Sequence, residues 1–160
     1  MGPGQLTGWI SGLQRSAGGV PKLPVPTAEI TSAGLTGDRQ RNLKYHGGPD
    51  RALCLLAQEV IDGLAAAGHP IARGSTGENI TIAGLDWTRL KTGDRLRLGS
   101  EVVLEITSFT APCRKIAGAF HDGDFSRLKQ ELHPGCSRLY ARVLTPGGLA
   151  VGDEVVLTIT

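Results

Sequence analysis

Apolar residues recur along the chain either at every second position or in short unbroken runs, which is the spacing of β-strands. Strands are therefore predicted at residues 6–10, 28–31, 52–57, 79–83, 95–98, 102–109, 139–144 and 154–159. Residues 58–67 place Val60, Ile61 and Leu64 on one helical face, and Gly68 follows as a helix stop. Shorter helices are predicted at residues 113–120 and 125–132. Strands outnumber helices and do not alternate with them regularly, which favours an antiparallel or mixed barrel over a doubly wound sheet.

The composition agrees with many short elements in one domain. Of the 160 residues, 40% are hydrophobic and 20% are charged, and glycine (23) with proline (9) supplies a fifth of the chain. A chain of this length buries a core without disulfides, and abundant glycine and proline favour tight turns over a helix bundle. We predict a mainly β fold with a few short helices, forming a single domain over residues 5–159 with no separate N- or C-terminal domain.

The charge balance excludes a general affinity for polyanions. The 17 basic and 15 acidic residues give a formal net charge of +2, too small to predict binding to nucleic acid or to a membrane surface. No apolar run approaches the roughly 18 residues of a membrane-spanning helix, and the N-terminus does not resemble a secretion signal. The three cysteines are widely spaced, which is not typical of a disulfide framework. We therefore expect a cytoplasmic protein with neither a nucleic-acid nor a membrane partner.

Residues 34–50 form a long segment without buried periodicity, and this is the first candidate binding loop. Its basic and glycine residues are Arg39, Arg41, Lys44, His46, Gly47 and Gly48. Loops longer than about 12–15 residues in compact domains are usually functional or disordered. Arginine side chains offer forked donors to phosphate, and paired glycines let backbone amides approach an anion. The segment predicts an anion site, with a solvated basic loop as the alternative.

A second turn of small residues, 74–79, leads into a predicted strand. It ends with Gly77, Glu78 and Asn79, and its amides can line a polar contact. The turn matches neither the phosphate loop GxxxxGK[ST] nor a GxGxxG sequence that opens a helix. Nucleotide hydrolysis is therefore disfavoured.

The sharpest chemical feature is residues 109–115, where a predicted strand ends and a short helix begins. Thr110 is expected to cap that helix, and Pro112 is tolerated in its first turn because the missing amide has no partner there. Cys113 then lies near a positive helix end, an environment that favours the thiolate. Thiolates attack electrophiles and bind soft metals. A half-buried structural cysteine is the alternative.

The other two cysteines give weaker signals. Cys54 lies in an apolar run and is interpreted as a core residue, and Cys136 lies in a loop as an incidental residue. A zinc site made of Cys113, Cys136, His121 and His133 is disfavoured. Of these residues, only His133 and Cys136 have the short spacing that is typical of zinc ligands.

Taken together, these segments resemble the MOSC domain family, named after the C-terminal domain of molybdenum cofactor sulfurase. The matching pieces follow the family's order over roughly residues 5–159: Gly37-Asp38, His46-Gly47-Gly48 with Arg51-Ala52-Leu53, Gly77-Glu78-Asn79 with Gly84-Leu85, Gly93-Asp94, Pro112-Cys113, and Tyr140-Ala141-Arg142-Val143 with Gly152-Asp153. No single piece is specific, but the ordered set is. The resemblance, to small stand-alone bacterial-type members, implies a MOSC-like β-barrel of the pyruvate-kinase type. It also implies binding of the molybdenum cofactor (molybdopterin), a pterin dithiolene that carries a phosphate.

Carried over residue by residue, the resemblance implies that Cys113 ligates molybdenum or carries a sulfane sulfur. It implies cofactor contacts from His46, Gly47, Gly48, Gly77, Glu78, Asn79, Thr110, Ala111 and Arg114. The residue that meets the phosphate stays open, with Arg39, Arg41 and Arg138 as candidates and Lys44 in the same loop as the first two.

The implied activity is an oxidoreductase that reduces small N-hydroxylated compounds by oxygen-atom transfer at a Cys113-ligated molybdenum. No flavin, haem or iron–sulfur signature is visible in the sequence, so electrons are expected from a separate reductase. A second hypothesis is a non-enzymatic carrier that delivers the cofactor, or a persulfide sulfur on Cys113, to a recipient enzyme. A third is a barrel that binds another small anion, with Cys113 merely packed. For self-association, a symmetric homodimer is the base-rate expectation.

Overall fold

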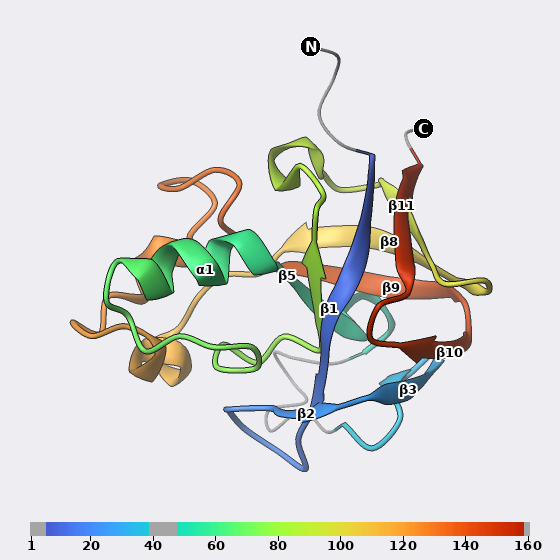
Figure 1. Cartoon of the computed structure of the whole chain (residues 1–160), viewed down its shortest axis with the longest axis horizontal. Helices are drawn as coiled ribbons and strands as arrows, with labels where there is room; N and C mark the ends of the chain where they lie inside the picture. Colours follow the sequence, from blue (N-terminus) through green and yellow to red (C-terminus); the bar gives the residue numbers. More distant parts are fainter. Residues whose placement is uncertain (1–5, 39–47, 159–160) are drawn as a thin grey trace.

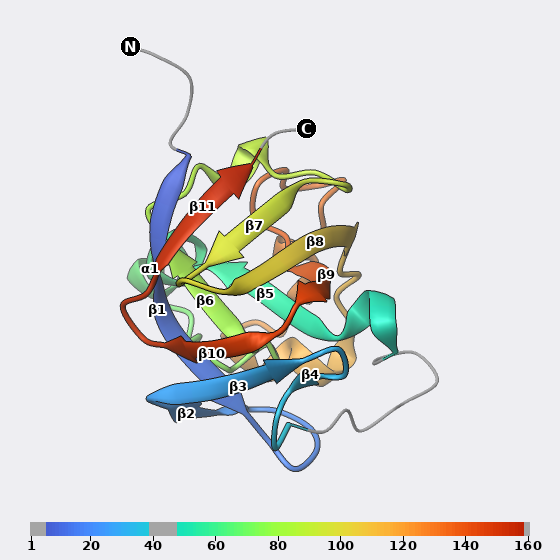
Figure 2. The same ribbon diagram turned by 90° about the vertical axis from the view of Figure 1, so that its right-hand side faces the viewer.

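The main sheet of the protein closes into a barrel (Figure 2). The computed structural model describes residues 6–38 and 48–158. Going round the barrel, the strands are β11 (Glu154–Thr158), β7 (Arg95–Leu98), β8 (Val102–Phe109), β9 (Leu139–Thr145), β5 (Leu53–Ala57), β6 (Ile80–Ala83) and β1 (Thr7–Arg15), which pairs back with β11. Within this barrel only β5 and β6 pair in parallel. The prediction of a mixed, mainly β barrel is therefore confirmed.

Four further strands complete the described sheets. β2 (Leu23–Val25) extends the barrel sheet beside β1, and a small second sheet holds β10 (Gly147–Ala150), β3 (Thr27–Thr31) and β4 (Gly34–Leu35). All eight predicted strand regions contain a strand, but β2, β4 and β10 were not predicted. They are two to four residues long and rich in glycine or proline, so they have no apolar alternation to detect.

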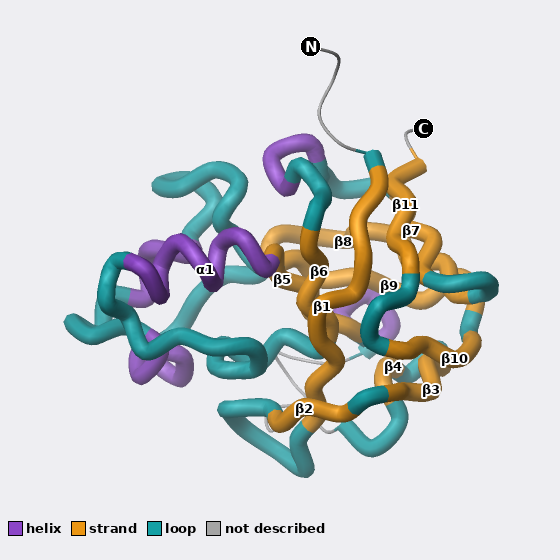
Figure 3. The backbone as a smooth tube through the Cα atoms, viewed as in Figure 1, coloured by secondary structure: helices purple, strands orange, loops and turns teal. Residues whose placement is uncertain are grey.

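Helix α1 and the two 3₁₀-helices that follow Cys113 lie to one side of the barrel, whereas the other two 3₁₀-helices lie elsewhere around it (Figures 1 and 3). Helix α1 (Gln58–Ala66) follows β5 directly and makes the crossover that a parallel strand pair requires. The 3₁₀-helices are η1 (Pro49–Arg51), η2 (Trp87–Arg89), η3 (Arg114–Ala119) and η4 (Phe125–Leu128). The two short predicted helices are thus 3₁₀ turns, and the second ends four residues earlier than expected. None of the described helices has the length and apolar character to cross a membrane.

Two groups of buried side chains stabilise this arrangement. The larger fills the barrel with inward-facing residues of alternate strand positions, including Ile10, Ile82 and Leu104. The smaller lies where Ile61 of α1 meets Ile116 of η3 and neighbouring residues of η4. The 3₁₀-helix η3 follows Cys113 directly, and this second cluster packs η3 against α1. The segment that carries Cys113 is therefore anchored on its C-terminal side.

Candidate functional site

Buried charges come together from four separate segments of the chain. The side chains of Lys22 and Asp38 are 4% and 6% exposed, Glu78 is completely buried, and Arg138 is 6% exposed. Burying a charge is costly unless it is paired and hydrogen-bonded, so such a group marks a candidate functional site in a small barrel. Glu78 and Arg138 are predicted site residues, whereas Lys22 lies outside every sequence motif and is not.

Glu78 holds the turn 74–79 in shape. Its carboxylate accepts hydrogen bonds from the Gly74 amide and the Thr76 hydroxyl, both at 2.7 Å. Burial raises the pKa of Glu78, although these two hydrogen bonds and the charge of Arg138 oppose the rise. The turn is tied to the rest of the site by the Lys22 amide, which donates to the Gly74 carbonyl at 2.9 Å.

Asn79 joins this turn to two other segments. Its side-chain carbonyl accepts from the Cys54 amide at 3.1 Å, and its amide group donates to the Asp38 carboxylate at 2.9 Å. Asp38 in turn binds the Lys22 ammonium at 2.7 Å. In the described structure Glu78 and Asn79 therefore brace the site, and their contact with a cofactor stays a prediction.

Arg138 brings a guanidinium group into the same region. One terminal nitrogen donates to the Thr76 carbonyl at 2.6 Å, whereas the buried Nε has no partner among the described residues. A buried donor without a partner costs about 1–3 kcal/mol, so this nitrogen favours an acceptor that is not part of the described chain. Arg138 is thus the described arginine best placed to meet an anionic group.

Cys113 is half-buried, and its segment adjoins Tyr140 and Arg51. The Arg51 guanidinium lies 5.3 Å above the centre of the Tyr140 ring. Burial is the main cause that raises the pKa of Tyr140 to about 12, and smaller contributions come from Cys54 and Cys113. A half-buried thiol remains reachable, as a metal ligand must be. Arg51 and Tyr140 were not named as site residues, although both stand in the family-matching pieces.

The expected cap of the helix after Cys113 is wrong. The 3₁₀-helix η3 begins at Arg114, and Cys113 itself precedes it without a side-chain capping bond. Thr110 is buried, its amide donates to the Arg138 carbonyl at 2.9 Å, and its hydroxyl lies 3.9 Å from the Cys54 sulfur. A helix dipole therefore gives no support to the Cys113 thiolate, because a six-residue 3₁₀ turn has few aligned peptides.

The remaining predicted site residues lie in four different places. Ala111 and Arg114 are exposed beside Cys113, and Gly77 has a φ of +84° in the braced turn. Gly48 precedes η1 with a φ of +80°, which favours glycine there. Arg39, Arg41, Lys44, His46 and Gly47 lie outside the described residues. Cys54 is buried and burial raises the pKa of its thiol, which confirms it as a core residue.

A cluster of possible metal ligands lies elsewhere, at His69, His121 and Asp122, whose ligand atoms are within 4.8 Å of one another. The two imidazole rings are stacked at 4.4 Å and inclined by only 14°, so one ion cannot lie in both ring planes as metal coordination requires. The Asp122 carboxylate binds Arg127 and the Asp124 amide. This cluster is therefore a packing arrangement, and metal ligation by Cys113 stays a prediction.

Comparisons with known proteins identify the family. The family model of the MOSC domain matches residues 42–156. The chain is 31% identical over 141 residues to the uncharacterized protein YflK of Bacillus subtilis, covering 87% of this chain and 62% of that protein. It is 33% identical over 105 residues to the protein YiiM of Escherichia coli, covering 63% of this chain and 46% of that protein. A 27% identical protein of Gibberella moniliformis, named a reductase, is covered over 23% of its length. The chain thus spans less than two thirds of these relatives.

Solved structures show the same fold. The YuaD protein from Bacillus subtilis superposes with a TM-score of 0.78 at 19% identity, and the match covers 99% of this chain and all of that one. YiiM from Geobacillus stearothermophilus superposes with a TM-score of 0.65 at 24% identity, covering 98% of this chain and 76% of that one. The barrel and its flanking helices are therefore a shared architecture.

Proposed function

The chain belongs to the MOSC domain family, and from this premise we propose that it binds the molybdenum cofactor, with Cys113 as a protein ligand to the metal, and reduces small N-hydroxylated compounds. Membership of this family relates the chain to molybdenum-cofactor proteins. The reaction and its substrate class are proposals, supported by the chemistry of the site residues.

The observation that carries the proposal is the buried guanidinium of Arg138 with its unpartnered Nε. The Arg138 carbonyl accepts a hydrogen bond at 2.9 Å from the amide of Thr110, three residues before Cys113, so a cation and a soft thiol lie on adjoining segments. A phosphate or a pterin carbonyl would give the Nε its missing acceptor, and charged acceptors form the stronger hydrogen bonds to arginine. The donor set of this site therefore fits the cofactor.

When bound, the molybdenum cofactor supplies two-electron oxygen-atom transfer. Within the chain, the Cys113 sulfur offers a soft ligand, and Arg138 binds and orients an anionic group. Glu78 holds the turn 74–79 in shape, and Asn79 attaches this turn to Cys54 near the start of β5. Because the Arg138 guanidinium donates to the Thr76 carbonyl of the same turn, its orientation is fixed as well.

We further propose that a separate reductase supplies electrons, because the sequence has no flavin, haem or iron–sulfur signature. The cytoplasm is the proposed location, since all three cysteines are free thiols.

The test expresses the protein in a host that makes the cofactor and measures molybdenum per chain. We expect Cys113→Ser to lose at least 90% of the bound metal, while Cys136→Ser, another half-buried cysteine, serves as the matched control and keeps it. The loaded protein should reduce a hydroxylamine with dithionite as donor. Equal molybdenum in the wild type and Cys113→Ser would remove Cys113 from the metal. Bound metal without turnover would contradict the proposed reduction of N-hydroxylated compounds and would favour the second hypothesis, a non-enzymatic carrier of the cofactor.

A further inference from the structure

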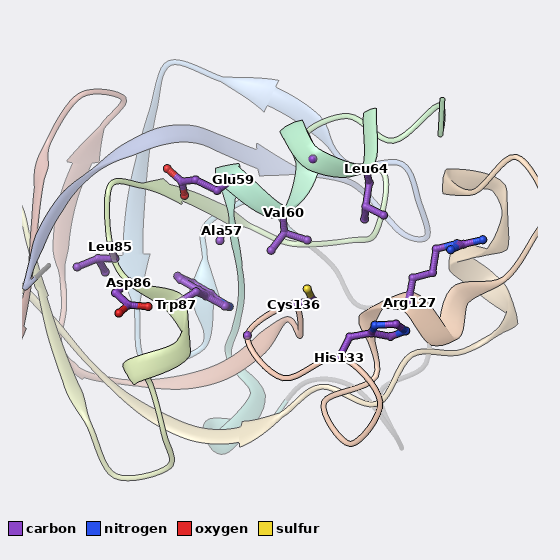
Figure 4. Close-up of a pocket in the computed structure, with 12 residues that line it drawn as sticks. Ala57, Glu59, Val60, Leu64, Leu85, Asp86, Trp87, Arg127, His133 and Cys136 are labelled. Atoms are coloured by element: carbon purple, nitrogen blue, oxygen red, sulfur yellow. The ribbon is translucent and has the colours of Figure 1, made fainter. Parts of the chain in front are cut away.

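A groove of about 490 Å³ runs along one side of α1, between that helix and the loop that contains Cys136 (Figure 4). None of its lining residues belongs to the buried-charge cluster or to the Cys113 segment. Its volume lies within the range of about 300–1,000 Å³ that is typical of small-molecule sites. The groove is therefore a second candidate binding site with its own lining, although Cys136 lies only two residues before Arg138 of the proposed cofactor site.

The walls of the groove are mainly apolar. Val60 and Leu64 project from α1, and Leu85 and Trp87 form the wall after β6 (Figure 4). The Trp87 indole nitrogen already donates to the Ser137 carbonyl at 2.8 Å, so Trp87 offers its ring to a ligand and not its N–H. Burial raises the pKa of Cys136, which keeps its thiol neutral and part of the apolar wall. These walls suit a hydrocarbon or aromatic body.

The polar groups of the groove are divided between its ends. Glu59 and Asp86 lie at one end, and Arg127 and His133 at the other (Figure 4). Arg127 forms an ion pair with Asp122 through a terminal nitrogen, and its buried Nε has no partner among the described residues. Within residues 6–38 and 48–158, the hydrogen bonds to these carboxylates come from neutral groups: the Gly84 amide for Glu59, and the Thr88 amide and hydroxyl for Asp86. Among the described residues no cation pairs with either carboxylate, so this end carries uncompensated negative charge.

We propose that the groove binds a small organic cation, with an apolar or aromatic body between Val60 and Trp87 and its cationic group beside Glu59 and Asp86. Apolar walls alone do not distinguish one hydrophobic molecule from another. The two carboxylates give the groove its preference, because opposite charges attract more strongly beside an apolar wall than in open water. The proposal does not depend on the cofactor, so the apoprotein is sufficient to test it.

Three probes of nearly equal size isolate the charge: 2-phenylethylammonium, neutral 2-phenylethanol and anionic 3-phenylpropionate. Binding is followed by fluorescence in the Trp9→Phe background, where Trp87 is the remaining tryptophan. Protection of Cys136 from alkylation, mapped by mass spectrometry against Cys113 in the same sample, gives a second reading at the groove. We expect the ammonium probe to bind at least tenfold more tightly than the carboxylate probe and to protect Cys136.

Variants at the groove provide the controls. Glu59→Gln with Asp86→Asn keeps an oxygen acceptor at both positions, and we expect it to remove the preference for the cation. A Cβ at Gly63 would meet nothing within 4 Å, so Gly63→Leu should fold, fill the groove and abolish binding of all three probes. Gly63→Ala is the matched control, because it makes the same change in helix propensity without filling the groove.

Equal affinity for the three probes, or no binding of any of them at millimolar concentration, would overturn the proposal. Binding that survives Gly63→Leu would place the probe elsewhere and would also overturn it. A dimer that Gly63→Leu disrupts would show that a second copy covers the groove, which excludes a small-molecule site there.

Discussion

The ammonium of Lys22 lies 2.7 Å from the carboxylate of Asp38, and both side chains are almost completely buried. Asp38 also accepts hydrogen bonds from the Ser16 amide at 3.0 Å and the Asn79 side chain at 2.9 Å. Asp38 is the last described residue before position 39, where the predicted basic loop continues. The ion pair therefore fixes the start of that loop against the turn that ends in Asn79.

Breaking this pair should destabilise the protein strongly. Asp38→Asn leaves the Lys22 charge buried without a counter-charge, and we expect a loss of about 3–5 kcal/mol in the free energy of unfolding, measured with urea. Glu154→Gln is the comparison, because Arg97 and Glu154 are 54% and 64% exposed in their pair and such pairs contribute about 1 kcal/mol or less. Similar losses in the two variants would show that the buried pair contributes no more than the exposed one.

Glu78 should make stability depend on pH. Because burial raises its folded pKa above the ordinary value of 4.5, the folded protein holds the proton more tightly than the unfolded chain. The free energy of unfolding should therefore fall as pH rises from about 4.5 through the folded pKa. Glu78→Gln has no proton to lose and keeps one oxygen acceptor, so its urea-unfolding free energy should fall less over this range. An identical slope in both proteins would contradict this assignment.

A side chain at Gly74 should disturb the braced turn. Gly74 has a φ of +86°, and a Cβ there would collide with the Lys22 carbonyl oxygen. Gly93 has a similar φ of +95°, but a Cβ there would meet nothing within 4 Å. Gly93→Ala should lose about 1–2 kcal/mol from the strained backbone alone, and Gly74→Ala clearly more. Thermal unfolding measures the stability of both variants, and the difference between their losses is the cost of the collision at Gly74. Equal losses of stability in the two variants would exclude such a collision.

The thiols should differ in reactivity with an alkylating agent. Burial raises the pKa of Cys54 and blocks access to its sulfur, whereas Cys113 is half-buried. Without cofactor, we expect Cys113 to react at least tenfold faster than Cys54 at neutral pH, as followed by mass spectrometry. In the protein unfolded with urea, the alkylation rates of Cys54 and Cys113 should become similar. This control shows that the difference comes from the fold and not from the neighbouring residues in the sequence. Comparable rates in the folded protein would mean that Cys113 is as inaccessible as the core cysteine.

Much of the fold was predictable because its signals are local. The alternation in residues 95–98 and 102–109 follows from one face of each strand meeting the barrel interior, and the structure places β7 and β8 at those positions. Cys54 was recognised as a core residue from the apolar run around it. The cap at Thr110 failed because its hydroxyl lies beside Cys54, a contact 56 residues away along the chain.

The sequence by itself determined the mainly β architecture, the family and the candidate thiol, since periodicity and motif order need only neighbouring residues. Only the tertiary structure decided that Lys22 joins Asp38, that Arg138 reaches the Thr76 carbonyl 62 residues away, and that Glu59 and Asp86 share one end of a groove. Side-chain pairing of this kind depends on which distant segments the barrel brings together, and no local pattern of hydrophobic and polar positions records it.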